Sequence, residues 1–142
     1  MMRITKPILA AGTLAIMFGG IALATSLNVW KTESSKEPAR FVRGDYAGLP
    51  NPADIRGSYT WLDLERVFGI DAAEAAAAFA PPGLSLGTAD RVSVLETAYA
   101  GLLPAGKEVG TDSVRLFVAL LTGLPHVPEE GTALPPGAVA YL

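Results

Sequence analysis

The densest run of side chains suited to binding lies between residues 54 and 61. It combines Asp54, Arg56, Tyr59 and Trp61. Arginine, tyrosine and tryptophan are the residues most enriched among the anchors of protein interfaces. We therefore predict that these four residues form a partner-binding surface. The alternative is structural: the two charged residues order the loop that precedes a helix, and the two aromatic rings fill the core.

Catalytic chemistry has little support in the sequence. His126, the only histidine, stands between two loop residues, and no nucleophile with a carboxylate lies near it to suggest a hydrolase triad. Glu129 and Glu130 follow, but one histidine and two adjacent carboxylates are weak evidence for a metal site. The chain has no cysteine, so it can form no disulfide, thiolate metal site or iron–sulfur ligation. We expect no catalytic residue, metal or cofactor, and leave open an enzyme with an unrecognised carboxylate site.

A hydrophobic segment occupies residues 8–27 and contains no charged side chain. Twenty helical residues rise about 30 Å, the thickness of a bilayer core. Trp30 and Lys31 follow, and a tryptophan beside a lysine is typical of the membrane interface. We predict that residues 1–30 are an N-terminal tail and a transmembrane anchor, and that the protein is a single-pass protein of the cell membrane.

The sequence leaves alternatives for two properties of this segment: whether it is cleaved and how it is oriented in the membrane. Ala22-Leu23-Ala24 fits the cleavage site of a signal peptide, although the apolar run continues beyond it, which favours an uncleaved anchor. The count of basic residues on the two sides favours a cytoplasmic C-terminus. However, a short basic tail before a hydrophobic segment is the layout of a signal anchor. We expect the C-terminal domain to be extracytoplasmic.

Charge excludes one class of partner. Residues 45–142 carry twelve acidic and five basic side chains, so this part of the chain is strongly acidic. Such a surface repels phosphate backbones. The stretch from 60 to 79 resembles a helix–turn–helix unit, but its second helix is rich in alanine and has no side chain to read a base. We therefore expect no nucleic-acid partner.

The remaining pattern predicts an all-α protein: a polar linker over residues 31–44, then a small acidic domain of four to five helices with extended loops over 45–142. Val114, Phe117, Val118 and Leu121 recur with helical spacing and predict a core face. Capping and stop signals delimit the helices. We expect a helix capped by Thr60 and ended by Gly69, one over about 71–79, one over 88–99, one capped by Thr111 or Asp112 and ended by Gly123, and a last turn over 138–142.

Several short segments of the sequence resemble those of a known family. They are KTESSK (31–36), NPADIRGSYT (51–60), FGI (68–70), VGTDSVRLFVAL (109–120) and GLP (123–125). They resemble a poorly characterised family of prokaryotic membrane proteins. In that family, such a domain occurs alone behind one membrane helix, or appended to polytopic membrane proteins with iron–sulfur motifs of the ferredoxin (4Fe-4S) type.

The resemblance implies at most an accessory to membrane redox chemistry, because a chain without cysteine cannot itself hold the cluster. The resulting prediction is a non-catalytic, membrane-anchored interaction module whose partner is a membrane protein, in association with an iron–sulfur redox system. The alternative is an extracytoplasmic domain that binds a small ligand in a pocket near Trp61 and the loop of Asp54 and Arg56.

Overall fold

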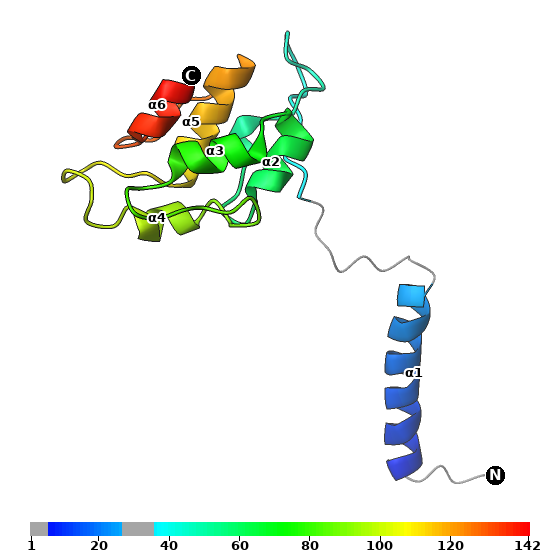
Figure 1. Cartoon of the computed structure of the whole chain (residues 1–142). Coiled ribbons are helices and arrows are strands. Elements are labelled where there is room, and N and C mark those ends of the chain that lie inside the picture. Colours follow the sequence, from blue (N-terminus) through cyan, green and yellow to red (C-terminus); the bar gives the residue numbers. More distant parts are fainter. Residues whose placement is uncertain (1–5, 27–35) are drawn as a thin grey trace. The chain divides into compact units, whose positions relative to one another are not determined.

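The computed structural model describes residues 6–26 and 36–142. The chain divides into two compact units, Met1–Ser35 and Lys36–Leu142. In the described residues, the regular structure is helical, and the β-type pairing consists of isolated bridges (Figure 1). The predicted all-α class is confirmed for this part of the chain. The second unit contains five α-helices, in agreement with the predicted four to five.

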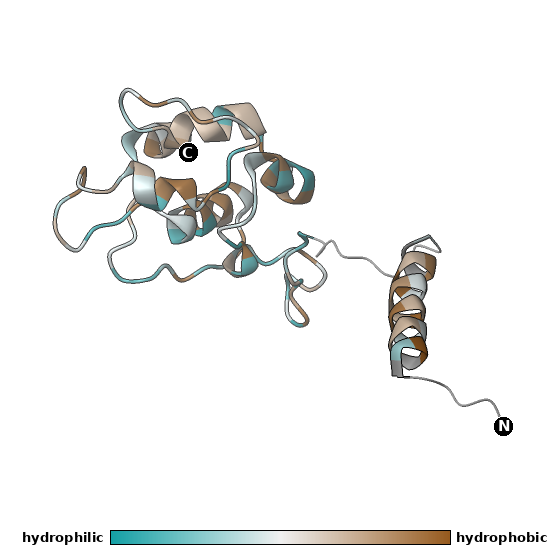
Figure 2. Cartoon of the chain, turned by 90° about the horizontal axis from the view of Figure 1, so that it is seen from below, coloured by the Kyte–Doolittle hydropathy of each residue, from teal (hydrophilic) through white to brown (hydrophobic). Residues whose placement is uncertain are grey.

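The first unit contains one helix, α1 (Lys6–Ser26, 21 residues). Hydrophobic residues recur along the helix with a few hydrophilic ones between them (Figure 2), and Ile8, Ile16 and Phe18 are exposed. The sequence predicted a helix over 8–27, and the structure confirms the helix up to Ser26. Among the residues that the structure describes, however, no helix is long and apolar enough to cross a membrane. The expected interfacial residues Trp30 and Lys31 lie outside the described residues.

The second unit begins earlier than the sequence predicted. Residues 36–44 were assigned to a linker, but Lys36 Nζ lies 3.1 Å from Asp63 Oδ2, and the Ala39 amide donates to Asp54 Oδ2 at 2.7 Å. Pro38 is buried. These contacts join residues 15 and 27 positions apart, so local sequence patterns do not reveal them. The rest of the predicted linker, 31–35, lies outside the described residues.

Two helices follow their predicted signals. In α2 (Trp61–Phe68), the Asp63 amide donates to Thr60 Oγ1 at 3.2 Å while the Thr60 amide donates to Asp63 Oδ2 at 2.9 Å. This is the predicted capping box, and Gly69 ends the helix in the left-handed conformation at φ 71°. Asp71 is the N-cap of α3 (Ala72–Phe79), and its Oδ1 accepts from the Glu74 amide at 2.8 Å.

The third predicted helix is much shorter than expected. The sequence predicted 88–99, whereas α4 spans only Val94–Ala98. The preceding residues pair with the backbone of a turn instead: the Val92 amide donates to the Tyr59 carbonyl at 2.9 Å, and the Ser93 amide donates to the Gly57 carbonyl at 3.1 Å. Long-range backbone pairing therefore satisfies donors that the prediction placed in a helix.

The C-terminal helices correct two boundaries. In α5 (Thr111–Thr122), the N-cap is Gly110, whose amide donates to Ser113 Oγ at 3.2 Å, rather than Thr111 or Asp112. Gly123 ends α5 as predicted. The last turn expected over 138–142 is a helix, α6 (Pro136–Tyr141). A short 3-10 helix, η1 (Pro52–Asp54), precedes α2.

A chain of aromatic rings joins four helices in the core. Trp61 and Phe79 have ring centroids 5.3 Å apart, Phe79 and Phe117 5.1 Å, and Phe117 and Tyr141 5.4 Å. Phe117 is only 1% exposed, so the face predicted from its spacing is a core face. Leu121 is half-buried at the edge of this face. The core thereby fixes α5, whose first turn positions the side chains described next.

Candidate functional site

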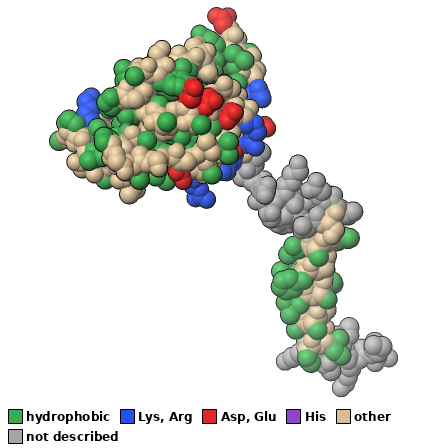
Figure 3. Space-filling view, viewed as in Figure 1, with side chains coloured by type: hydrophobic (Ala, Val, Ile, Leu, Met, Phe, Trp, Pro, Cys, Tyr) green, Lys and Arg blue, Asp and Glu red, His purple; other side chains and the backbone are tan. Residues whose placement is uncertain are grey.

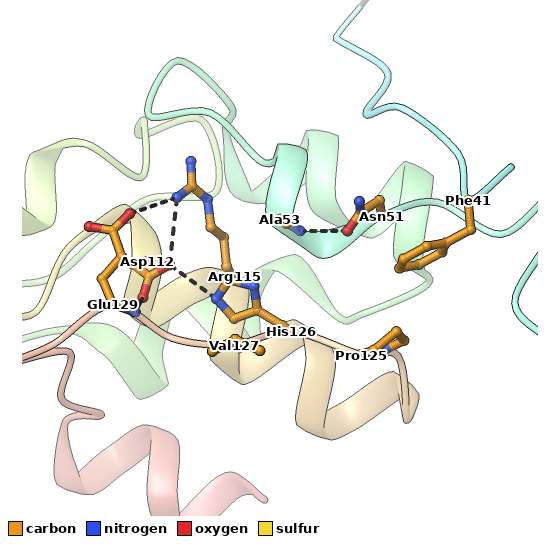
Figure 4. A pocket seen from close by; sticks show the side chains of 9 residues that line it. All are labelled: Phe41, Asn51, Ala53, Asp112, Arg115, Pro125, His126, Val127 and Glu129. Atoms are coloured by element: carbon orange, nitrogen blue, oxygen red, sulfur yellow. Dashed lines mark hydrogen bonds and ion pairs between the residues drawn. The ribbon is translucent and has the colours of Figure 1, made fainter. Parts of the chain in front are cut away.

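The described part of the second unit has an open hollow of about 440 Å³ beside the first turn of α5 (Figure 4). Three segments line it: the region from the start of the unit to η1, the beginning of α5, and the loop after α5. The lining residues are Phe41, Asn51, Ala53, Asp112, Arg115, Pro125, His126, Val127 and Glu129.

Asp112 is the centre of the polar side of this hollow, and its side chain is only 8% exposed. Its Oδ2 accepts hydrogen bonds from Thr132 Oγ1 at 2.6 Å and from the Glu129 amide at 2.8 Å. Its Oδ1 lies 3.0 Å from His126 Nε2. Because Asp112 lies in the first turn of α5, the helix dipole also favours its negative charge. Asp112 therefore ties the loop 126–132 to the start of α5.

The same contacts set the ionisation of Asp112. Burial by itself raises the pKa of a carboxyl group. Here the hydrogen bonds from Thr132 and the Glu129 amide, together with the charge and hydrogen bond of His126, outweigh burial and lower the pKa of Asp112 below its usual value. Asp112 is consequently an ionised carboxylate at neutral pH.

Arg115 lies one turn further along α5, on the same side as Asp112. Its Nε donates to the Ile55 carbonyl at 2.9 Å, which fixes the guanidinium. One terminal nitrogen then lies 3.5 Å from Asp112 Oδ1 and 3.6 Å from Glu129 Oε1, as ion pairs (Figure 4). Arg115 therefore links the segment before α2 to both α5 and the loop that follows it.

The polar groups of the hollow can recognise a ligand, and one pair of them also resembles part of a catalytic site. The pair of His126 and Asp112 resembles the base and orienting group of a hydrolase triad. However, none of the residues that line the hollow carries a hydroxyl or a thiol for His126 to activate. Within residues 6–26 and 36–142, no three histidine, cysteine or acidic side chains are grouped to hold a metal ion. The lining offers instead charged groups, one amide and several apolar surfaces.

The four residues predicted to bind a partner are divided by the structure. Tyr59 and Trp61 are 2% and 1% exposed and belong to the core. Asp54 and Arg56 lie at the surface, with Asp54 Oδ1 3.8 Å from an Arg56 terminal nitrogen. Of the four predicted residues, therefore, only Asp54 and Arg56 can take part in a binding surface, and the two aromatic rings pack in the core.

Sequence reasoning missed the cluster around Asp112. The spacing of Asp112 and Arg115 at i and i+3 on a predicted helix was available as a signal for an ion pair. His126 and Thr132 approach Asp112 only because the loop after α5 turns back, over 14 and 20 residues. Nothing in the local sequence predicts that return. The ligand-binding alternative expected a pocket near Trp61 and the loop of Asp54 and Arg56. The hollow lies beside η1, which contains Asp54, but Trp61 is not among its lining residues.

Comparison of the chain with protein-family models, with curated proteins and with solved structures found no match. The resemblance to a family of prokaryotic membrane proteins therefore stays a prediction.

Proposed function

We propose that the chain is a non-catalytic interaction module anchored to the cell membrane by α1. The observation that carries this proposal is the character of α1. Its 21 residues have no charged side chain after Lys6, and hydrophobic side chains occur along its visible side (Figure 3). A helix that is apolar on every side has no polar face to present to water and needs an apolar environment. We infer that a bilayer supplies it.

The second unit is the interaction part of this proposal. Nine residues separate Ser26 from Lys36, so even a fully extended connection reaches only about 35 Å. Confinement near the membrane raises the effective concentration of any membrane-protein partner, and a weak binding surface then suffices. The resemblance suggests an iron–sulfur redox protein as that partner, with this chain as its cysteine-free accessory.

Alkaline carbonate extraction of cell membranes tests the anchor. We expect the full chain to stay with the membranes and to have the intact mass of the uncleaved protein, while a chain of residues 36–142 is released. A mature protein that begins at Thr25 would contradict the proposal. We also propose that the second unit is extracytoplasmic: a Ser35→Cys protein should react with an impermeant maleimide in intact cells, and labelling only after lysis would reverse that orientation.

Arg56→Ala tests docking through the exposed part of the 54–61 stretch. We expect the melting temperature to change little, because the Arg56 side chain is 63% exposed, while co-purification of the membrane partner falls. Lys107→Ala, which removes an exposed basic side chain from the loop between α4 and α5, is the matched control. An Arg56→Ala protein with unchanged stability and unchanged partners would refute docking at this position.

The hollow favours a second candidate, an extracytoplasmic domain that binds a small ligand. Its lining combines the fixed cation of Arg115, the buried carboxylate of Asp112 and the ring of Phe41. A ligand that binds only the native state raises the melting temperature. A compound that stabilises the wild type but not Glu129→Ala would support this candidate, because the Glu129 carboxylate lines the hollow and its side chain is 69% exposed. Equal stabilisation of both proteins would show that the ligand does not bind in the hollow.

A further inference from the structure

Residues 40–50 form a closed loop that projects from the second unit, and we refer to them as the 40–50 loop (Figure 1). Arg40 and Pro50 pair as an isolated antiparallel bridge at its base. The Phe41 amide donates to the Leu49 carbonyl at 2.9 Å, and the Gly48 amide donates to the Phe41 carbonyl at 2.8 Å. The 40–50 loop therefore has a defined backbone.

Those outer side chains are apolar and face water. Val42 is 88% exposed, Leu49 46% and Tyr46 40%. The Tyr46 ring packs on Phe41 with centroids 6.0 Å apart, which holds the tyrosine at the outside of the loop. An ordered loop that keeps three apolar side chains in water is a candidate contact with an apolar phase.

The charge of the 40–50 loop is opposite to that of its surroundings. The loop carries Arg40 and Arg43 against Asp45, whereas residues 51–142 carry five basic and eleven acidic side chains. The Arg40 guanidinium donates to the Gly48 carbonyl at 2.7 Å, which keeps one positive charge beside the loop backbone. Basic side chains beside a tyrosine and aliphatic groups are typical of segments that lie in a membrane interface.

We propose that the 40–50 loop inserts Val42, Tyr46 and Leu49 into the headgroup region of an anionic bilayer, with its arginines against lipid phosphates. The inference rests on the proposed anchoring of α1, because the tether brings the loop to that bilayer. Three apolar side chains bury far less area than a stable protein–protein interface. For a unit already held at the membrane, so small a contact is sufficient. These considerations favour the lipid surface over a protein as the occupant.

The absence of cysteine permits a direct test on the full chain. Val42→Cys is labelled with an environment-sensitive fluorophore and reconstituted into phosphatidylcholine vesicles, with or without phosphatidylserine. We expect a blue-shifted emission and quenching by brominated lipid on the vesicles that contain phosphatidylserine. The matched control is Val139→Cys, an exposed valine of α6 (58% exposed), whose label should stay in water.

A charge variant sharpens the test. In the labelled Val42→Cys protein, Arg43→Gln should lower the ratio of inserted to free loop about fivefold on anionic vesicles. Arg91→Gln, which removes an exposed arginine outside the loop, should leave that ratio unchanged. If Arg91→Gln lowers the ratio as much as Arg43→Gln, the proposed contact between the loop and the headgroups is wrong.

Vesicle flotation separates failure of this inference from failure of the anchor. A chain that floats while its position-42 label behaves like the position-139 label would overturn membrane insertion of the loop and leave the anchor standing. A chain that does not float would overturn the anchor and this inference together. If the label is shielded from water only after a membrane-protein partner is added, the loop contacts a protein and not the lipid, and the inference is wrong.

Discussion

The inner face and the first turn of α5 are stabilised in different ways. On the inner face, Phe117, Val114 and Val118 are at most 1% exposed and belong to the apolar core. In the first turn, Asp112 is also buried, but hydrogen bonds and ion pairs hold its side chain.

The difference shows how one helix supports two kinds of contact. Apolar packing is non-directional and holds α5 against α3 and α6. The polar contacts of Asp112 are directional and fix the course of a single loop, 126–132. We therefore expect variants of the inner face to change the stability of the whole unit and variants of the first turn to act mainly on the hollow and its loop.

The largest expected effect is that of Phe117→Ala. Removing this ring leaves a cavity between Phe79 and Tyr141, and such substitutions lower the free energy of unfolding by about 3–5 kcal/mol. Urea denaturation measures the change, with Leu120→Ala, an exposed residue of the same helix, as the control. A loss below about 1 kcal/mol would show that the inner face is not the main source of stability.

Asp112→Ala is expected to cost less, about 2 kcal/mol, because it removes hydrogen bonds to a charged group and leaves His126 and Thr132 without their acceptor. Amide hydrogen exchange should rise in residues 126–132 more than in the core. Glu130→Ala removes an exposed acidic residue of the same loop and should have little effect. An equal rise in exchange throughout the unit would mean that Asp112, like Phe117, stabilises the whole unit and not the loop alone.

The pH dependence of stability distinguishes the two regions further. The pKa of Asp112 and that of Asp63 are both lowered from 3.8. As the pH falls, the unfolded chain takes up protons on these two carboxylates before the native chain does. Their contribution to the free energy of unfolding is therefore complete above about pH 4 and is lost as the pH falls through the lowered native pKa values. Urea unfolding at successive pH values should show the decline, and Asp112→Asn should make it shallower. Phe117→Leu should leave its slope unchanged.

The smallest expected effect is that of Thr60→Ala, which removes the hydroxyl that accepts from the Asp63 amide at the start of α2. Loss of an N-cap of this kind costs about 1 kcal/mol. Ser58→Ala, at an exposed position just before it, is the control for urea denaturation. If the two variants are equally stable, this cap contributes nothing beyond the packing of Trp61.

Local signals predicted the parts of the fold that are stabilised locally. The capping box of Thr60 and Asp63, the stop at Gly69 and the apolar spacing around Phe117 each depend on residues within one or two helical turns, and each is confirmed. The expected helix over 88–99 failed because its first half pairs with the backbone of Gly57 and Tyr59, more than thirty positions away.

The sequence alone determined the helical class, the positions of α2, α3 and α5, and the absence of charged side chains from α1 after Lys6, because helix caps and periodicity act between neighbouring residues. Only the tertiary structure decided that Tyr59 and Trp61 are core residues, that Asp112 meets His126, and that residues 40–50 project as an ordered loop. Each of these depends on where a loop returns. That return is set by hydrogen bonds and burial between distant segments, which no local pattern encodes.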